Sequence, residues 1–89
     1  MTNLEIQIQL WHEKKYGKTV NIPKAYRKLL EEVGELGEAM MRQDPEAIRE
    51  EAGDVAMVLT HIIRGCCPDN PSLSLALAAT LEKCLGRMK

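Results

Sequence analysis

The dipeptide Asp44-Pro45 separates two long stretches of helical pattern, and no other feature restricts the fold of this chain as much. Aspartate is a favoured N-cap residue and proline is favoured in the first helical turn, so the pair predicts that a new helix begins here. The preceding helix is expected to end near Arg42, which leaves a very short link. Helices joined by so short a link lie side by side and antiparallel.

Cap and turn residues divide the whole chain into four helical segments, and no alternating pattern typical of strands competes with them. The expected helices cover about residues 4–16, 23–42, 45–64 and 73–86. Gly17 and Gly65 are expected to end the first and the third helix. The sequence therefore predicts an all-α fold, an antiparallel bundle of about four helices in a single domain spanning residues 1–89.

The length of the chain favours self-association. With 89 residues, a single chain buries only a modest fraction of its surface, and its core alone would be marginal. A two-helix core would need a partner to complete its apolar packing. We expect the bundle to be completed by dimerisation, in a homodimer or a homotetramer.

Other partners and locations are not favoured by the composition. No run of eighteen apolar residues is present, so no membrane span is expected. The N-terminal residues lack the basic and apolar regions of a signal peptide, which leaves a cytoplasmic location as the expectation. No basic stripe with interleaved aromatics occurs, so a nucleic-acid partner is not expected.

Four acidic residues have matched spacing on the two central helices: Glu32 and Glu35 on one, Glu51 and Asp54 on the other. A separation of three residues places both members of a pair on one helix face. Glu35 lies about eight residues before the turn and Glu51 about seven residues after it, so the pairs sit at similar height along the hairpin. Four carboxylates at one place repel each other, and a hard cation such as Mg²⁺ or Mn²⁺ relieves that repulsion.

The charge of the chain is unevenly distributed. Residues 31–54 contain nine acids and two bases, a net −7, whereas the rest contains four acids and ten bases, a net +6. An acidic centre with basic flanks would suit a metal site that handles a polyphosphate. Solvated helix faces of mixed charge would produce the same distribution, and charge alone favours that simpler interpretation.

The block K-L-L-E-E-V-G-E-L-G-E-A, followed about fifteen residues later by E-E-A-G-D-V, resembles the MazG family of all-α nucleoside triphosphate pyrophosphohydrolases. The family pattern is E-E-x-x-E, a spacer, and E-x-x-D. It corresponds here to Glu31, Glu32 and Glu35, followed by Glu51 and Asp54. The resemblance is good over residues 28–63 and looser over the final helix.

The resemblance implies an enzyme that hydrolyses an NTP or dNTP to the monophosphate and pyrophosphate with Mg²⁺, by attack of water on the α-phosphorus. It implies that Glu32, Glu35, Glu51 and Asp54 are metal ligands, while Glu31 orients a ligand or acts as a base. It implies that Lys83 and Arg87 contact the phosphates, and Lys28 is a further candidate for such a contact.

Two further residues are candidates for contacts with the nucleotide. His61 stands where some relatives have asparagine, on the stripe that faces the acids; it is either a polar contact or an ordinary half-buried histidine. Trp11 could stack on a base, although the scarcity of aromatics favours core packing. His12 is adjacent to Trp11 and is expected to point elsewhere.

Two other functions remain open. One is the related phosphoribosyl-ATP pyrophosphohydrolase of histidine synthesis, which has a similar acidic pattern. The other is a non-catalytic helical interaction module that binds a divalent metal or nothing, because acids on a helix face are usually solvated. A third class, the di-iron carboxylate bundle, is set aside, because it needs Glu-x-x-His pairs and both pairs here end in an acid.

Overall fold

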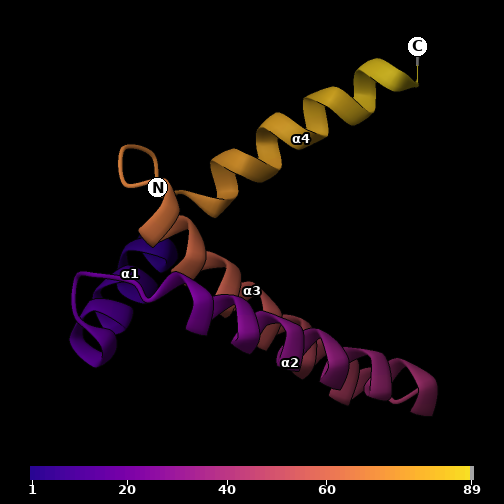
Figure 1. Ribbon diagram of the computed structural model, residues 1–89. Helices are drawn as coiled ribbons and strands as arrows, with labels where there is room; N and C mark the ends of the chain where they lie inside the picture. Colours follow the sequence, from indigo (N-terminus) through magenta and orange to yellow (C-terminus); the bar gives the residue numbers. More distant parts are fainter. Residues whose placement is uncertain (89) are drawn as a thin grey trace.

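The computed structural model describes residues 1–88 and confirms the all-α fold with four helices (Figure 1). No strand occurs in this range. No helix in the described chain is both long enough and apolar enough to cross a membrane. The helices are α1 (Asn3–Tyr16), α2 (Ile22–Arg42), α3 (Pro45–Cys66) and α4 (Leu73–Arg87).

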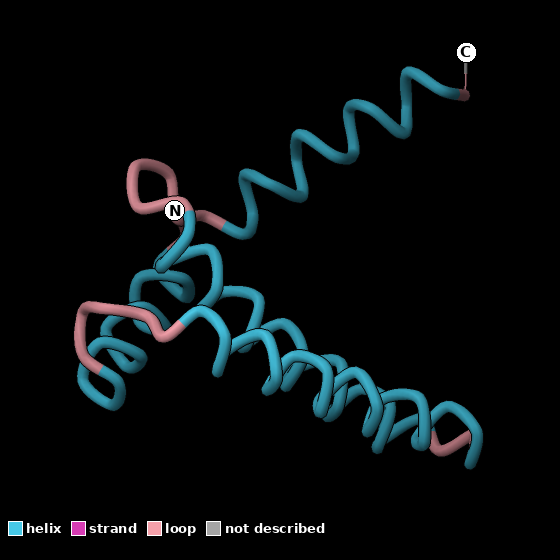
Figure 2. The backbone as a smooth tube through the Cα atoms, viewed as in Figure 1, coloured by secondary structure: helices cyan, strands magenta, loops and turns pink. Residues whose placement is uncertain are grey.

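Helices α2 and α3 form the antiparallel hairpin that the Asp44-Pro45 link predicts, and they pack along most of their length (Figures 1 and 2). Asp44 caps α3, and its Oδ1 accepts a hydrogen bond of 3.2 Å from the backbone N–H of Ala47. Gln43 ends α2 in the left-handed region, with φ 55°. Two residues therefore reverse the chain, and the turn fixes the register between the helices.

Helix α1 packs on α3 near the open end of the hairpin. Thr2 and Glu5 form a capping box at its start, and Gly17 ends it at φ 81°, where a side chain would be strained. Arg64 of α3 donates hydrogen bonds to the carbonyl oxygens of Gly17 and Lys18, at 3.0 and 3.2 Å. These bonds tie the connection between α1 and α2 to α3.

The expected end of α3 at Gly65 is wrong, because the helix continues to Cys66. Gly65 lies inside the last turn, where the connection between α1 and α2 approaches the helix. A side chain at this position would overlap Val20. The glycine is therefore explained by close packing rather than by a left-handed helix end.

Helix α4 projects from the other three helices and contacts only the end of α3 to any extent (Figure 2). Its start is held by Glu5, which accepts a hydrogen bond from Ser72. Four of its leucines remain half or more exposed: Leu75, Leu77, Leu81 and Leu85. Within residues 1–88 the buried apolar residues are only Ala25 and Ala39, so one chain builds a very small core.

Candidate metal centre

Helices α2 and α3 bring three of the four predicted carboxylates together. Glu32, Glu35 and Glu51 each place one carboxylate oxygen within 4.8 Å of the others. Glu32 is 6% exposed, and the other two are half-buried. The short link and the spacing of three residues produce this cluster, because they set the pairs at one height on facing surfaces.

The cluster contains carboxylate oxygens that have no hydrogen-bond donor among the described residues. Oε2 of Glu32 and Oε2 of Glu51 are buried and receive no hydrogen bond from any residue in the range 1–88. The pKa of Glu35 is raised, first by the negative charge of Glu32 and further by partial burial and by Glu51. Buried, unpaired and mutually repelling carboxylates fit a hard divalent cation, which prefers oxygen ligands.

Asp54 lies apart from the three glutamates. It is exposed and outside the 4.8 Å cluster, one turn further along α3 than Glu51. It does line the cavity that opens beside the cluster. Of the three glutamates Glu32 lines the same cavity, so a ligand there can meet Asp54 and Glu32 at once.

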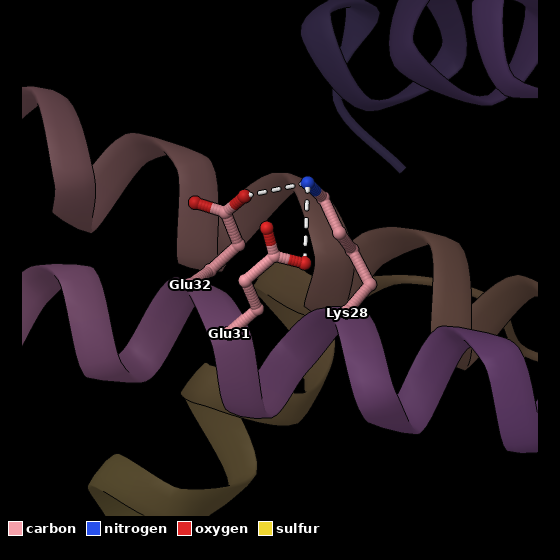
Figure 3. Close-up of polar contacts among 3 residues, drawn as sticks. All are labelled: Lys28, Glu31 and Glu32. Carbon is pink, nitrogen blue, oxygen red and sulfur yellow. Dashed lines mark ion pairs between the residues drawn. The ribbon is translucent and has the colours of Figure 1, made fainter.

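Lys28 and Glu31 lie beside the cluster on the same face of α2 (Figure 3). The amine of Lys28 is 3.0 Å from Oε1 of Glu32 and 3.9 Å from Oε2 of Glu31. The hydrogen bond to Glu32 is the main reason why the pKa of Lys28 is raised. Because the lysine side chain is about half exposed, this ion pair is weak and can exchange for another anion.

A cavity of about 770 Å³ opens between α1, α2 and α3 next to the cluster. One end carries charged groups and the other is aromatic, with His12 and Trp11 side by side at a ring separation of 5.1 Å. Trp11 is 47% exposed, so the expectation that it packs in the core is wrong. The expectation that His12 points elsewhere is also wrong. The charged end includes Lys28, Glu31, Glu32 and Asp54, and the aromatic end includes Trp11, His12, Tyr16 and His61.

Sequence reasoning gave His12 no role at the aromatic end and did not single out Arg64, which contacts that end through His61. His12 is 3% exposed, and burial, followed by the neighbouring His61 and Arg64, lowers its pKa to about 4. Arg64 is 7% exposed and contacts Nδ1 of His61 at 3.3 Å. The only signal in the sequence was the position of Arg64, one helical turn after His61.

The basic residues of the last helix do not reach the cavity within one chain. Lys83 and Arg87 are exposed on α4, which leads away from the α2–α3 hairpin (Figure 1). Neither residue lines the cavity. The structure therefore brings Lys28 and His61 to the site and leaves Lys83 and Arg87 outside it.

Three carboxylates between antiparallel helices form a group that could hold a divalent cation. The family model of the MazG nucleotide pyrophosphohydrolase domain matches residues 23–89, which include α2, α3 and α4. The chain therefore belongs to the MazG family, a family of nucleotide pyrophosphohydrolases that generally use a divalent metal. No curated protein and no solved structure gives a significant match.

Proposed function

We propose that the protein is an Mg²⁺-dependent nucleoside triphosphate pyrophosphohydrolase, which converts an NTP or dNTP to the monophosphate and pyrophosphate. The observation that carries this proposal is the unpaired, buried carboxylate oxygen on both Glu32 and Glu51, beside Glu35. Such oxygens are costly unless a cation meets them. Membership of a nucleotide pyrophosphohydrolase family supplies the reaction class.

In this proposal Glu32, Glu35 and Glu51 hold the cation, and Asp54 completes the ligand set from the cavity wall. When bound, Mg²⁺ supplies positive charge that neutralises the triphosphate and polarises its oxygens, and Mn²⁺ would supply the same. Glu31 lines the cavity beside the cluster, where its carboxylate can orient water or accept its proton. These five acidic residues are the catalytic set that we propose.

The remaining cavity residues would bind the nucleotide. Lys28 can exchange its weak ion pair with Glu32 for a phosphate oxygen, because its amine is already directed at the cluster. Trp11 lines the aromatic end of the cavity and offers an exposed ring for stacking on the base. His61 lies at the same end and offers a polar contact.

We further propose that two or four copies assemble through α4. The leucines of α4 face solvent in one chain, and the buried apolar residues are few. Assembly would cover Leu77, Leu81 and Leu85, which share one face of α4. It could also carry Lys83 and Arg87 to the cavity of a partner subunit, where they would contact phosphates. This arrangement accounts for basic residues that lie outside the cavity of their own chain.

The test is pyrophosphate release from a panel of NTPs, dNTPs and phosphoribosyl-ATP, with Mg²⁺ and with EDTA. We expect release from at least one NTP or dNTP with Mg²⁺ only, together with an equal amount of monophosphate. Release from phosphoribosyl-ATP alone would replace the proposal by the enzyme of histidine synthesis. No release from any of them, with weak Mg²⁺ binding, would favour the non-catalytic module.

A further inference from the structure

A buried arginine that does not itself line the cavity contacts His61 at its aromatic end, and backbone groups fix its position. Arg64 donates through Nη1 to the carbonyl oxygens of Gly17 and Lys18, at 3.0 and 3.2 Å. Its Nη2 lies 3.3 Å from Nδ1 of His61. The guanidinium is therefore held between the connection that follows α1 and a histidine that lines the cavity.

This contact determines which ring nitrogen of His61 carries the proton. A guanidinium has only donors, so Nδ1 of His61 must accept. Burial, and then the positive charge of Arg64, lower the pKa of His61, which favours the neutral imidazole. A neutral imidazole with an accepting Nδ1 carries its single proton on Nε2.

The Nε2–H of His61 has no competing hydrogen-bond partner in the described chain. No residue in the range 1–88 forms a hydrogen bond with this nitrogen, and the ring lines the cavity. The ring of His12 lies 4.8 Å away and that of Tyr16 lies 5.0 Å away. His12 lines the same cavity, and its buried Nδ1 also lacks a partner in the described chain. Unsatisfied polar groups at the wall of a cavity indicate that a polar ligand belongs there.

We propose that Arg64 is a positioning residue that holds His61 as an Nε2–H donor, and that this donor selects a nucleobase presenting a carbonyl oxygen over one presenting an amino group. The assignment of the ligand rests on the proposed function. An amino group opposite the fixed donor would leave two donors facing each other, and both would lose their hydrogen bonds. A carbonyl oxygen would satisfy the donor and place the flat base among the aromatic rings.

The state of His61 can be measured without substrate or metal, by long-range ¹H–¹⁵N correlation spectra of the labelled protein. The chain has two histidines, and the spectrum of His61→Gln identifies the signals of His61 by their loss. We expect the Nε2–H form in the wild type and a mixture of forms, with a higher pKa, in Arg64→Met. Arg64→Lys, which keeps a donor, should restore the Nε2–H form. An Nδ1–H form in the wild type would overturn the proposal, as would an unchanged His61 in Arg64→Met.

The selection of the base can be measured by calorimetry with nucleoside monophosphates in EDTA. Uridine and cytidine monophosphate differ at one edge of the base, where a carbonyl beside a ring N–H is replaced by an amino group beside a bare ring nitrogen. Inosine and adenosine monophosphate differ in the same way. We expect the carbonyl member of each pair to bind about three- to tenfold more tightly, the range that one hydrogen bond contributes. Equal binding within both pairs would overturn the ligand assignment.

His61→Gln is the matched variant for this measurement, and it leaves Arg64 in place. A glutamine amide can turn either its N–H or its carbonyl towards the base. Both members of each pair should therefore bind, and the ratio of their affinities should fall towards one. A preference that persists in His61→Gln would show that another group selects the base. If the protein hydrolyses NTPs but His61 carries its proton on Nδ1, only this inference is refuted. If His61 carries its proton on Nε2 but the protein hydrolyses no NTP, the proposed function is refuted and the role of Arg64 stands.

Discussion

The hydroxyl of Ser72 donates a hydrogen bond of 2.8 Å to Oε2 of Glu5, a residue 67 positions earlier in the chain. This bond joins the first turn of α1 to the N-cap of α4. The backbone N–H of Ser74 approaches the same oxygen at 3.5 Å. Hydrogen bonds from Ser74, Ser72 and Thr2 lower the pKa of Glu5 to about 2, from an ordinary value of 4.5. A charged carboxylate therefore anchors the start of the projecting helix.

The stability that Glu5 contributes to the fold decreases as the pH is lowered. Because its pKa is lower in the folded state, the contribution is fully present above pH 4.5 and is lost as the pH falls towards 2. Glu5→Gln should lower the free energy of unfolding by about 1 kcal/mol at pH 7 and by less at pH 3. Urea unfolding followed by circular dichroism at both pH values measures this difference. Glu82→Gln, on exposed α4, is the control, and an equal loss at both pH values would contradict the prediction.

Glu35→Gln should abolish hydrolysis while the fold is retained. Glu35 is one of the three proposed ligands, and its replacement would remove a charge that the cation needs, so we expect turnover to fall by at least about 100-fold. Pyrophosphate release and circular dichroism together measure activity and fold. Glu38→Gln is the matched control, since Glu38 is an exposed acid one turn further along α2 and outside the cluster. Wild-type turnover in Glu35→Gln would refute the site.

The repulsion within the cluster predicts that Mg²⁺ stabilises the protein more at pH 7 than near pH 4.5. The pKa of Glu35 is raised in the folded state, so its ionisation costs stability as the pH rises above its unfolded value. A cation removes that cost only where the carboxylate is charged. At 100 times its dissociation constant, a ligand adds about 2.7 kcal/mol. Calorimetric melting temperatures with and without Mg²⁺ at both pH values measure the effect.

Glu35→Gln serves as the matched variant for this measurement as well. It should melt at a higher temperature than the wild type without metal, because the repulsion is gone, and should gain less from Mg²⁺. A gain from Mg²⁺ that equals that of the wild type would place the ion elsewhere.

Gly65→Ala should destabilise the protein, because the new methyl group would overlap Val20 and displace the connection between α1 and α2. We expect a loss of about 1–3 kcal/mol in the free energy of unfolding. Gly37→Ala is the control within a helix, since a methyl group there meets nothing within 4 Å and should raise stability by up to about 1 kcal/mol. Urea unfolding compares them, and similar effects in both variants would argue against the close approach at Gly65.

A charge on the exposed leucine face of α4, formed by Leu77, Leu81 and Leu85, should disrupt the proposed assembly. Leu77→Glu or Leu81→Glu places a charge in the face that we propose to be covered by a partner, and the assembly should dissociate towards monomers. Ala79→Glu, on the opposite side of the helix, should leave the assembly intact. Light scattering coupled to size exclusion gives the mass of each variant. A monomeric wild type would refute the proposed assembly.

Features set by local rules were the ones that the sequence predicted. The Asp44 cap and the spacing of Glu32, Glu35 and Glu51 act within a few turns of one hairpin, so pattern alone placed three carboxylates together. Gly65 and Arg64 are different, because their roles depend on a connection about 46 residues away in the sequence. For Trp11 the scarcity of aromatics favoured core packing over stacking on a base, but the residue is 47% exposed and lines the cavity.

The direction of α4 has a consequence for genetics as well as for chemistry. If α4 supplies Arg87 to the cavity of a partner subunit, the carboxylates and the arginine of one active site come from different polypeptides. Chains with Glu35→Gln and chains with Arg87→Ala would each be inactive alone, yet a mixture of the two would form hybrids with one intact site. Such complementation would also make activity per molecule fall on dilution, as the hybrids and their parents separate.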